Sequence, residues 1–219
     1  MHRIKTVLLT SALTLAFLPS AAHSIEPYSC RNGFFPAEGK NTQLYRVSSQ
    51  QPVHFFKDDK GCPDSAACKQ KAYIVEGDNV LISKVDSSWA CAWYQGKKRE
   101  TVGWIEAEKI QPADDPLPAT SDWLGTWTAP ASSIKIERQT QEQLRVTGNA
   151  TWGSGASTNV GEIDGTLLLQ GRYAVTKDGE DAFACVVEFT RVGRFLIAHD
   201  NNNCGGMNVS FDGVYVRSQ

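Results

Sequence analysis

Six cysteines constrain this 219-residue chain more than any other feature of its sequence. They are Cys30, Cys62, Cys68, Cys91, Cys185 and Cys204. An even number of cysteines in an exported chain predicts disulfide bonds, which form in an oxidising compartment. The first question is therefore whether the chain carries an export signal.

The N-terminal segment MHRIKTVLLTSALTLAFLPSAAHS has two basic residues, an apolar run over Val7–Leu18 and small residues before Ile25. This pattern predicts a secretory signal peptide over residues 1–24, cleaved near Ala22 to Ser24. We therefore expect a periplasmic or secreted protein. No later apolar run is long enough to span a bilayer, so we expect no membrane insertion.

The charge of the mature chain excludes two classes of partner. Loss of Arg3 and Lys5 with the signal peptide leaves 20 of the 22 basic residues against 24 acidic ones, a net charge of about −4. This balance is too mildly acidic to favour nucleic acid or an anionic membrane. Nothing in the sequence calls for a cofactor, and we expect none.

The segment QPADDPLPATSD, residues 111–122, contains three prolines and three acidic residues without apolar periodicity. It predicts a linker between an N-terminal half, residues 25–110, and a C-terminal half, residues 123–219. Four cysteines precede the linker and two follow it. Each half can therefore pair its own thiols.

The N-terminal half contains short runs of β-branched and aromatic residues separated by the turn-forming segments EGDN, DSS and QGKKRE. This alternation predicts a small antiparallel meander. The expected strands are Ala72–Val75, Val80–Val85, Trp89–Tyr94 and Thr101–Ile105.

This half resembles bacterial SH3-like (SH3b) domains over roughly residues 42–110. The resemblance rests on an apolar strand, the Gly77-Asp78 turn, Trp89 in the central strands and a closing Gly103-Trp104. The family implies a small barrel with an aromatic groove for sugar rings or extended peptides. The groove residues it implies are Tyr45, Trp89, Tyr94 and Trp104, for which a role in the core alone is the simpler interpretation. The cysteine-bearing insertion GCPDSAAC, residues 61–68, departs from the family pattern.

Four cysteines in this half allow three pairings. Cys62 and Cys68 are close enough to close a tight loop, which leaves Cys30 for Cys91. The alternative is a four-thiolate zinc site, but a C-x5-C spacing is wider than the usual half-site and the compartment favours disulfides. We expect no metal.

The C-terminal half opens with WLGTW and continues as alternating segments of period two, for example LRVTGNATW over Leu144–Trp152. Seven or eight short strands in about 97 residues predict an antiparallel up-and-down β-barrel or a tight sandwich. The whole chain is therefore expected to be all-β. The other expected strands are Ile134–Ile136, Val160–Leu169, Phe183–Phe189, Arg194–His199 and Asn208–Val216.

Two resemblances concern this half. The opening Gly125-x-Trp127 is similar to lipocalin- and avidin-like barrels, in which the tryptophan plugs one end. The pattern from WLGTW to DNNNCGGMNVSFDGVYVR resembles a small domain of exported bacterial proteins that accompanies SH3-like modules, some of them labelled lysozyme-inhibitor-like. It implies a non-enzymatic envelope protein that binds a peptidoglycan fragment or a cell-wall hydrolase. An immunity protein against a secreted wall-targeting toxin is the alternative.

The stretch HDNNNC over residues 199–204 contains the residue types of a papain-like centre. A nucleophile must remain a free thiolate, however, and Cys185 is the other cysteine of this half. We therefore expect a Cys185–Cys204 bridge that closes a loop of about 20 residues. On this interpretation the segment around Asp200 to Asn203 forms Asx-type turns. The loop with Asn201, Asn202, Asn203 and Met207, and the glycine-rich segment over residues 153–158, are the two places that could reach toward a partner, although structural turns are the simpler interpretation of both.

An enzyme remains a further alternative, namely a cell-wall hydrolase that uses Glu162 and Asp164, with His199 as another candidate. Glu162 and Asp164 share one face of a predicted strand, where a solvated surface is the simpler interpretation. His54 with Asp58 and Asp59 could contact a cation, but a histidine near a charged loop is more simply a surface residue. The sequence thus favours binding over catalysis.

Overall fold

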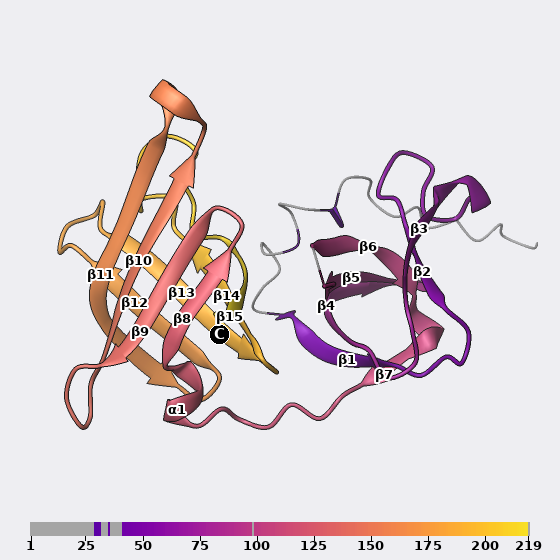
Figure 1. Cartoon of the computed structure of the whole chain (residues 1–219), viewed down its shortest axis with the longest axis horizontal. Coiled ribbons are helices and arrows are strands. Elements are labelled where there is room, and N and C mark those ends of the chain that lie inside the picture. The colour runs from indigo at the N-terminus through magenta and orange to yellow at the C-terminus, as the bar shows by residue number, and fades with distance from the viewer. Residues whose placement is uncertain (1–28, 32–34, 36–40, 98, 219) are drawn as a thin grey trace, which may run out of the picture.

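The computed structural model describes residues 29–31, 35, 41–97 and 99–218. The predicted signal peptide and its cleavage point lie outside these residues. The chain is all-β, as predicted: a seven-stranded antiparallel sheet is followed by a closed eight-stranded antiparallel barrel (Figure 1). No helix in the described part of the chain is long and apolar enough to cross a membrane.

The N-terminal sheet has the strand order β3-β2-β6-β5-β4-β1-β7. Two short 3-10 helices, η2 (Ala66–Cys68) and η3 (Ala107–Lys109), interrupt its connections. Its strands are β1 (Gln43–Val47), β2 (Val53–Phe56), β3 (Lys69–Ile74), β4 (Asn79–Asp86), β5 (Trp89–Gln95), β6 (Glu100–Glu106) and β7 (Ile110–Pro112).

Alternation along β5 divides this sheet between two cores, because successive side chains of a strand point to opposite faces. Ala90 and Ala92 pack in one apolar cluster, together with Val53, Phe55 and Ile105. Cys91 and Trp93 face the other way and join a second cluster. This second cluster also contains residues of the barrel.

Both predicted disulfides of this half are confirmed. Cys30 bonds Cys91, which ties the N-terminal segment to the central strand β5. Cys62 bonds Cys68 and closes the predicted small loop. The free cysteines that a thiolate zinc site would need are absent from the described residues, in which every cysteine is bridged.

The barrel is up-and-down, because each strand pairs with its neighbour in the chain and β15 returns to pair with β8. The short helix α1 (Thr120–Trp123) precedes it, and the 3-10 helix η4 (Gly155–Ser157) interrupts it. Its strands are β8 (Gly125–Ala129), β9 (Ser132–Arg138), β10 (Leu144–Trp152), β11 (Asn159–Gln170), β12 (Tyr173–Asp178), β13 (Cys185–Val192), β14 (Phe195–Asp200) and β15 (Gly213–Arg217).

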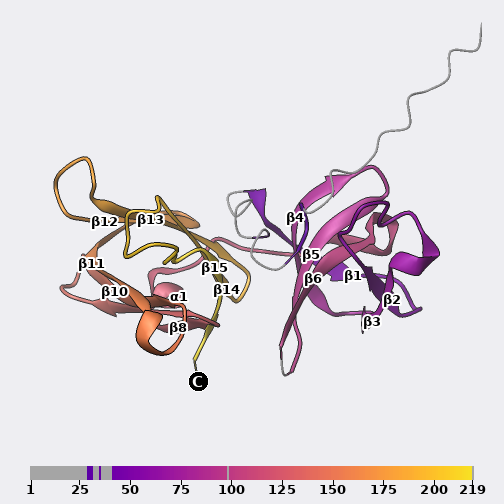
Figure 2. The ribbon, with the colours of Figure 1, turned by 90° about the horizontal axis from the view of Figure 1, so that it is seen from above.

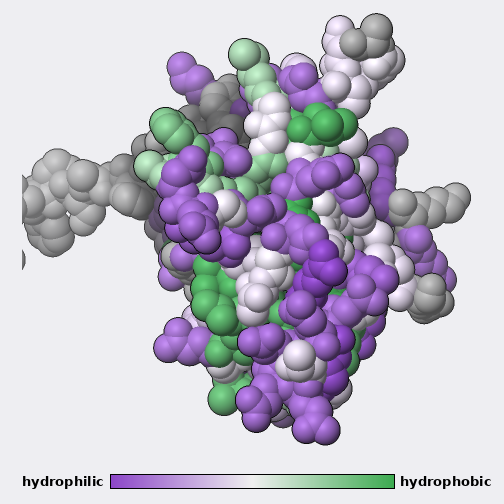
Figure 3. Space-filling view, turned by 90° about the vertical axis from the view of Figure 1, so that its left-hand side faces the viewer, coloured by the Kyte–Doolittle hydropathy of each residue, from purple (hydrophilic) through white to green (hydrophobic). Residues whose placement is uncertain are grey.

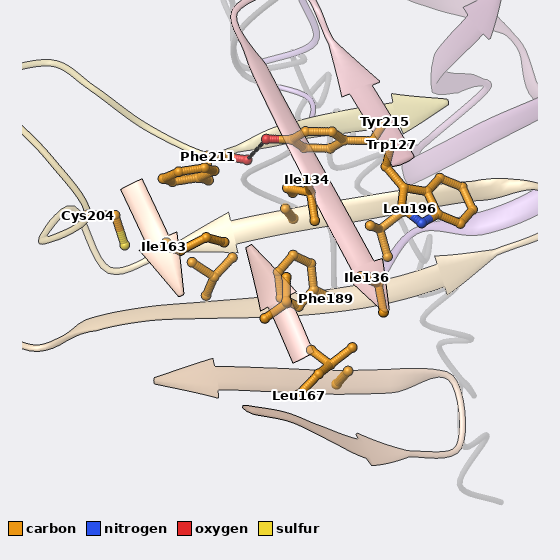
Figure 4. Packing of buried hydrophobic residues seen from close by; sticks show 14 of the residues in the cluster. Trp127, Ile134, Ile136, Ile163, Leu167, Phe189, Leu196, Cys204, Phe211 and Tyr215 are labelled. Carbon is orange, nitrogen blue, oxygen red and sulfur yellow. Dashed lines mark hydrogen bonds between the residues drawn. The ribbon is translucent and has the colours of Figure 1, made fainter. Parts of the chain in front are cut away.

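Large side chains fill the barrel interior (Figure 4). Ile134, Ile163, Phe189 and Leu196 come from four different strands, and each is at most 2% exposed. Tyr215 is also buried, and its hydroxyl donates a hydrogen bond of 2.7 Å to the carbonyl oxygen of Phe211. Burial raises the pKa of this phenol. A core packed in this way leaves the outer surfaces and loops to carry binding.

Trp127 is buried at one end of the barrel, where two guanidinium groups lie over its ring. The Arg191 group lies 4.5 Å from the ring centroid and the Arg217 group 4.8 Å. The indole Nε1 donates to the carbonyl oxygen of Trp123 at 2.9 Å. Burial is the main cause that lowers the pKa of Arg191 to about 10, and the positive charge of Arg217 adds to it.

The sheet and the barrel lie side by side (Figure 2). An apolar cluster to which both contribute joins them. The rings of Trp93 and Phe195 meet edge to face, with centroids 5.1 Å apart. The predicted linker takes part in this junction. Its residue Asp115 accepts hydrogen bonds from the Gly193 amide at 2.8 Å and from Arg172 Nη1 at 2.5 Å.

Candidate functional site

Four hairpin connections lie at the same end of the barrel, because alternate turns of an up-and-down barrel share an end. They are the β8–β9, β10–β11, β12–β13 and β14–β15 connections, and we call this region the loop end. Large apolar side chains are exposed at this end, among them Trp152 at the end of β10 at 50%, Phe183 at 79% and Met207 at 79%. Large exposed apolar groups gathered in one region are typical of binding surfaces.

Hydrogen bonds join the β10–β11 hairpin to the β14–β15 loop. Asn159, the ladder partner of Trp152, donates from Nδ2 to the carbonyl oxygen of Met207 at 2.7 Å. The Gly206 amide donates to the carbonyl oxygen of Val160 at 3.1 Å. These contacts hold the two segments that the sequence singled out as partner-reaching loops side by side. The hairpin itself projects beyond the rest of the barrel (Figure 1).

The third predicted disulfide, Cys185–Cys204, is also present and fixes the β14–β15 loop to the start of β13. Beside it, Asn201 Nδ2 donates to the carbonyl oxygen of Ala184 at 2.9 Å, and Asn201 Oδ1 accepts from the Val186 amide at 3.1 Å. The loop that carries Phe183 is thereby tied to the loop that carries Met207. Three of the four connections form one braced surface.

The predicted residues of the β14–β15 loop have different roles. Asn201 is a structural bridge, as its three hydrogen-bonded neighbours show. Asn202 adopts a left-handed backbone conformation with φ of 61°, which asparagine tolerates better than most residues. Asn202, Asn203 and Met207 are exposed and free to face a partner.

A buried carboxylate organises the base of this loop. Asp200 is 2% exposed and accepts hydrogen bonds from the amides of Asn202 and Phe211 and from the Ser210 hydroxyl. Nearby, Asp212 accepts from the Asp200 amide at 2.7 Å. Burial, opposed by that hydrogen bond, raises the pKa of Asp212.

The four aromatics of the predicted groove are not all on one face of the sheet. Trp104 is fully buried, and its Nε1 donates to Asp58 at 2.9 Å. Trp89 packs with Trp104 against the same cluster, whereas Tyr45 and Tyr94 pack against the cluster on the opposite face. Tyr45, Trp89 and Tyr94 are half-buried, with Trp89 on the face of the sheet opposite to Tyr45 and Tyr94.

The two carboxylates of the hydrolase alternative lie on the outer wall of the barrel. Glu162 and Asp164 are both exposed on β11, two residues apart. Asp164 accepts from Arg145 Nε at 2.7 Å, and this hydrogen bond lowers its pKa. A carboxyl group whose pKa is lowered is ionised at neutral pH and has no proton to donate, whereas the general acid of a glycosidase has a raised pKa.

His54 and Asp58, which the sequence suggested as contacts for a cation, instead form hydrogen bonds within the N-terminal half. His54 Nδ1 lies 2.9 Å from the carbonyl oxygen of Gln70. Asp58 accepts from the Cys30 amide at 2.7 Å as well as from Trp104, and Asp59 is exposed. Across the part of the chain that the structure describes, no group of three or more His, Cys, Asp or Glu side chains is placed to hold a metal ion.

Sequence reasoning missed Trp152 and Phe183 as surface residues. The alternation of Leu144–Trp152 predicts that Trp152 faces the core, together with Ala150. The β10–β11 ribbon continues past the mouth of the barrel, however, and its last inward-facing position meets solvent. The position of Trp152 directly before the glycine-rich turn was the sequence signal that could have indicated its exposure.

A second apolar area lies on the outer wall over β11, β12 and β13, where Leu168, Tyr173 and Val175 line a shallow groove. Leu117 of the linker segment lies near its edge, close to Gly171. On this side of the molecule, hydrophobic residues form separate groups within a largely hydrophilic surface (Figure 3).

Comparison with known proteins gives no match: no family model, no curated protein and no solved structure is similar to this chain. The resemblances stated from the sequence therefore remain expectations. The function has to be argued from the geometry of the loop end and from the disulfides, which place the folded chain in an extracytoplasmic compartment.

Proposed function

We propose that this chain is an exported, non-enzymatic binding protein of the bacterial envelope. The observation that carries the proposal is the loop end, where Trp152, Phe183 and Met207 are exposed on connections that a disulfide and hydrogen bonds brace together. Braced loops lose little conformational entropy on binding, which favours affinity. The filled interior of the barrel supports binding by this outer surface.

The partner in this proposal is a cell-wall hydrolase, bound and inhibited in the manner of a lysozyme-type inhibitor, or a peptidoglycan fragment. The SH3-like resemblance of the N-terminal half supports an envelope location, and the periplasm or the cell exterior fits its three disulfides. The immunity-protein alternative uses the same surface and differs only in its partner. A hydrolase centred on Glu162 and Asp164 has weaker support, because Asp164 is paired with Arg145 on an open wall.

A capture experiment tests the proposal. The mature protein is immobilised and exposed to periplasmic extract, with and without added lysozyme, and to peptidoglycan fragments. We expect stoichiometric retention of a hydrolase or of wall fragments, lost in the triple variant Trp152→Ser, Phe183→Ser, Met207→Ser. All three side chains are already exposed, so the variant should fold normally.

The matched control is Leu168→Ser, which removes an apolar side chain that is 63% exposed on the outer wall. It should retain the partner. If the triple variant still captured the partner and the Leu168→Ser control did not, the binding surface would lie on the outer wall and not at the loop end. Retention of nothing by the native protein would contradict the proposed function.

A further inference from the structure

The charged residues around the loop end are unevenly distributed. Lys177, near the end of β12, donates a hydrogen bond from Nζ to the carbonyl oxygen of Glu180. His199 lies with its Nδ1 3.3 Å from Asp212. The acidic residues that are exposed or half-exposed there are Glu162, Asp178, Glu180, Asp181 and Asp212. The other connections, over residues 130–131, 153–158 and 201–212, contain one charged residue, Asp212.

Two of these carboxylates also shape the loops, and all remain near the surface. Asp181 Oδ1 accepts from the Phe183 amide at 2.8 Å, which fixes the backbone that carries this exposed ring. Asp178 Oδ2 accepts from the Asp164 amide at 3.0 Å. Phe183 is therefore presented next to acidic residues, and the exposed apolar groups share the loop end with a negative field.

The opposite end of the barrel is mixed in sign. Arg138, Arg194 and Arg217 are exposed near its turns, together with Glu142 and Asp122. Arg172, also at that end, is paired with Asp115. An excess of negative charge thus belongs to the loop end and is not a uniform property of the barrel.

From this distribution we infer that the partner is a protein with a basic surface around an apolar patch, docked on the loop end. The inference rests on the proposed function and chooses among its partners. Peptidoglycan carries carboxylates on its stem peptides, so an acidic surface would repel it. A basic protein would be attracted from a distance and then held by the apolar groups, because complementary charge mainly raises the association rate.

The test measures association kinetics of the full mature chain with the protein recovered by capture, with lysozyme as a basic reference protein. We expect the association rate constant to fall at least tenfold between low and high ionic strength, since exposed charges are screened beyond about 10 Å at 0.1 M salt. The variant Glu162→Lys, Glu180→Lys should lower the rate constant at low salt by about tenfold or more.

The matched control is Glu108→Lys, Glu142→Lys, which makes the same change in net charge at exposed positions away from the loop end. It should change the rate constant by no more than about twofold, since those charges are distant from the docking surface. Equal losses in both double variants, a salt-independent rate, or an acidic captured protein would overturn the inference while leaving the binding function in place.

Purified peptidoglycan sacculi form the second arm. Retention of sacculi through the loop end, without any captured protein, would also overturn the inference while still supporting a binding protein. Failure to capture either partner would instead contradict the proposed function itself. The two failures are therefore distinguishable.

Discussion

At the scale of single residues, a few buried polar side chains fix the loops and segments around them by hydrogen bonds. Asp200 is the clearest case, because three donors of the β14–β15 loop converge on its carboxylate. Asp58 has the same role in the other half, where it joins Cys30 to Trp104. Buried carboxylates are retained in folded proteins when hydrogen bonds replace their lost hydration.

Asp200→Ala should lower the free energy of unfolding by about 3 kcal/mol, because it leaves the Phe211 and Asn202 amides without their acceptor. Asp200→Asn keeps one acceptor oxygen and should lower the free energy of unfolding by less. Chemical denaturation of the purified variants measures both. The control is Asp164→Ala on the exposed wall, whose pairing with Arg145 is solvent-accessible and should leave the midpoint almost unchanged. Equal losses at the two positions would contradict the assigned role of Asp200.

At the scale of elements, the sequence predicted some strands closely and overextended others. The predicted strand Leu144–Trp152 has the same bounds as β10, because its alternation reflects one buried and one solvated face. The predicted strand Asn208–Val216 is β15 only from Gly213 onward. Val209 and Phe211 are buried and mimic the alternation of a strand, but their backbone belongs to the loop that wraps around Asp200.

Other strands have too little local sequence pattern to be predicted. The strands β1 and β2 are short and depend on partners far along the chain, as the pairing of β1 with β4 and β7 shows. The disulfides were predictable because cysteine spacing limits the pairings. The loop end was predictable only in part, since the meeting of its connections depends on closure of the whole barrel.

Removal of the Cys185–Cys204 bond by the double variant Cys185→Ala, Cys204→Ala should lower the free energy of unfolding by about 3 kcal/mol on a chain-entropy estimate. It should also accelerate amide exchange over the β14–β15 loop, because the bond fixes this loop to β13. Exchange measured by mass spectrometry reports both effects.

The comparison variant is Cys62→Ala, Cys68→Ala, which removes a bond of sequence separation 6 in the other half. It should leave exchange in the β14–β15 loop unchanged. Loosening of that loop by both variants, or by neither, would contradict the bracing role of the Cys185–Cys204 bond.

At the scale of the whole molecule, the sheet and the barrel share one apolar cluster. Leu44, Leu81 and Trp93 come from the sheet, and Val192 and Phe195 come from the barrel. Domains joined by a small polar interface move relative to one another, whereas a large apolar interface couples them. The linker residue Asp115 adds hydrogen bonds to Arg172 and Gly193 at the same junction. The loop end is therefore presented by a two-part unit.

This coupling predicts that the native protein unfolds in a single calorimetric transition, because neither half keeps its full core without the other. Phe195→Ala removes a ring that is 2% exposed at the junction, and it should split the transition into two. Phe189→Ala removes an equally buried ring from inside the barrel, where a truncation of this type costs about 3–5 kcal/mol. Because it leaves the junction intact, it should lower the midpoint and keep one transition. A single transition in both variants would mean that Asp115 and the remaining contacts suffice for coupling, and two transitions in the native protein would show that the halves fold independently.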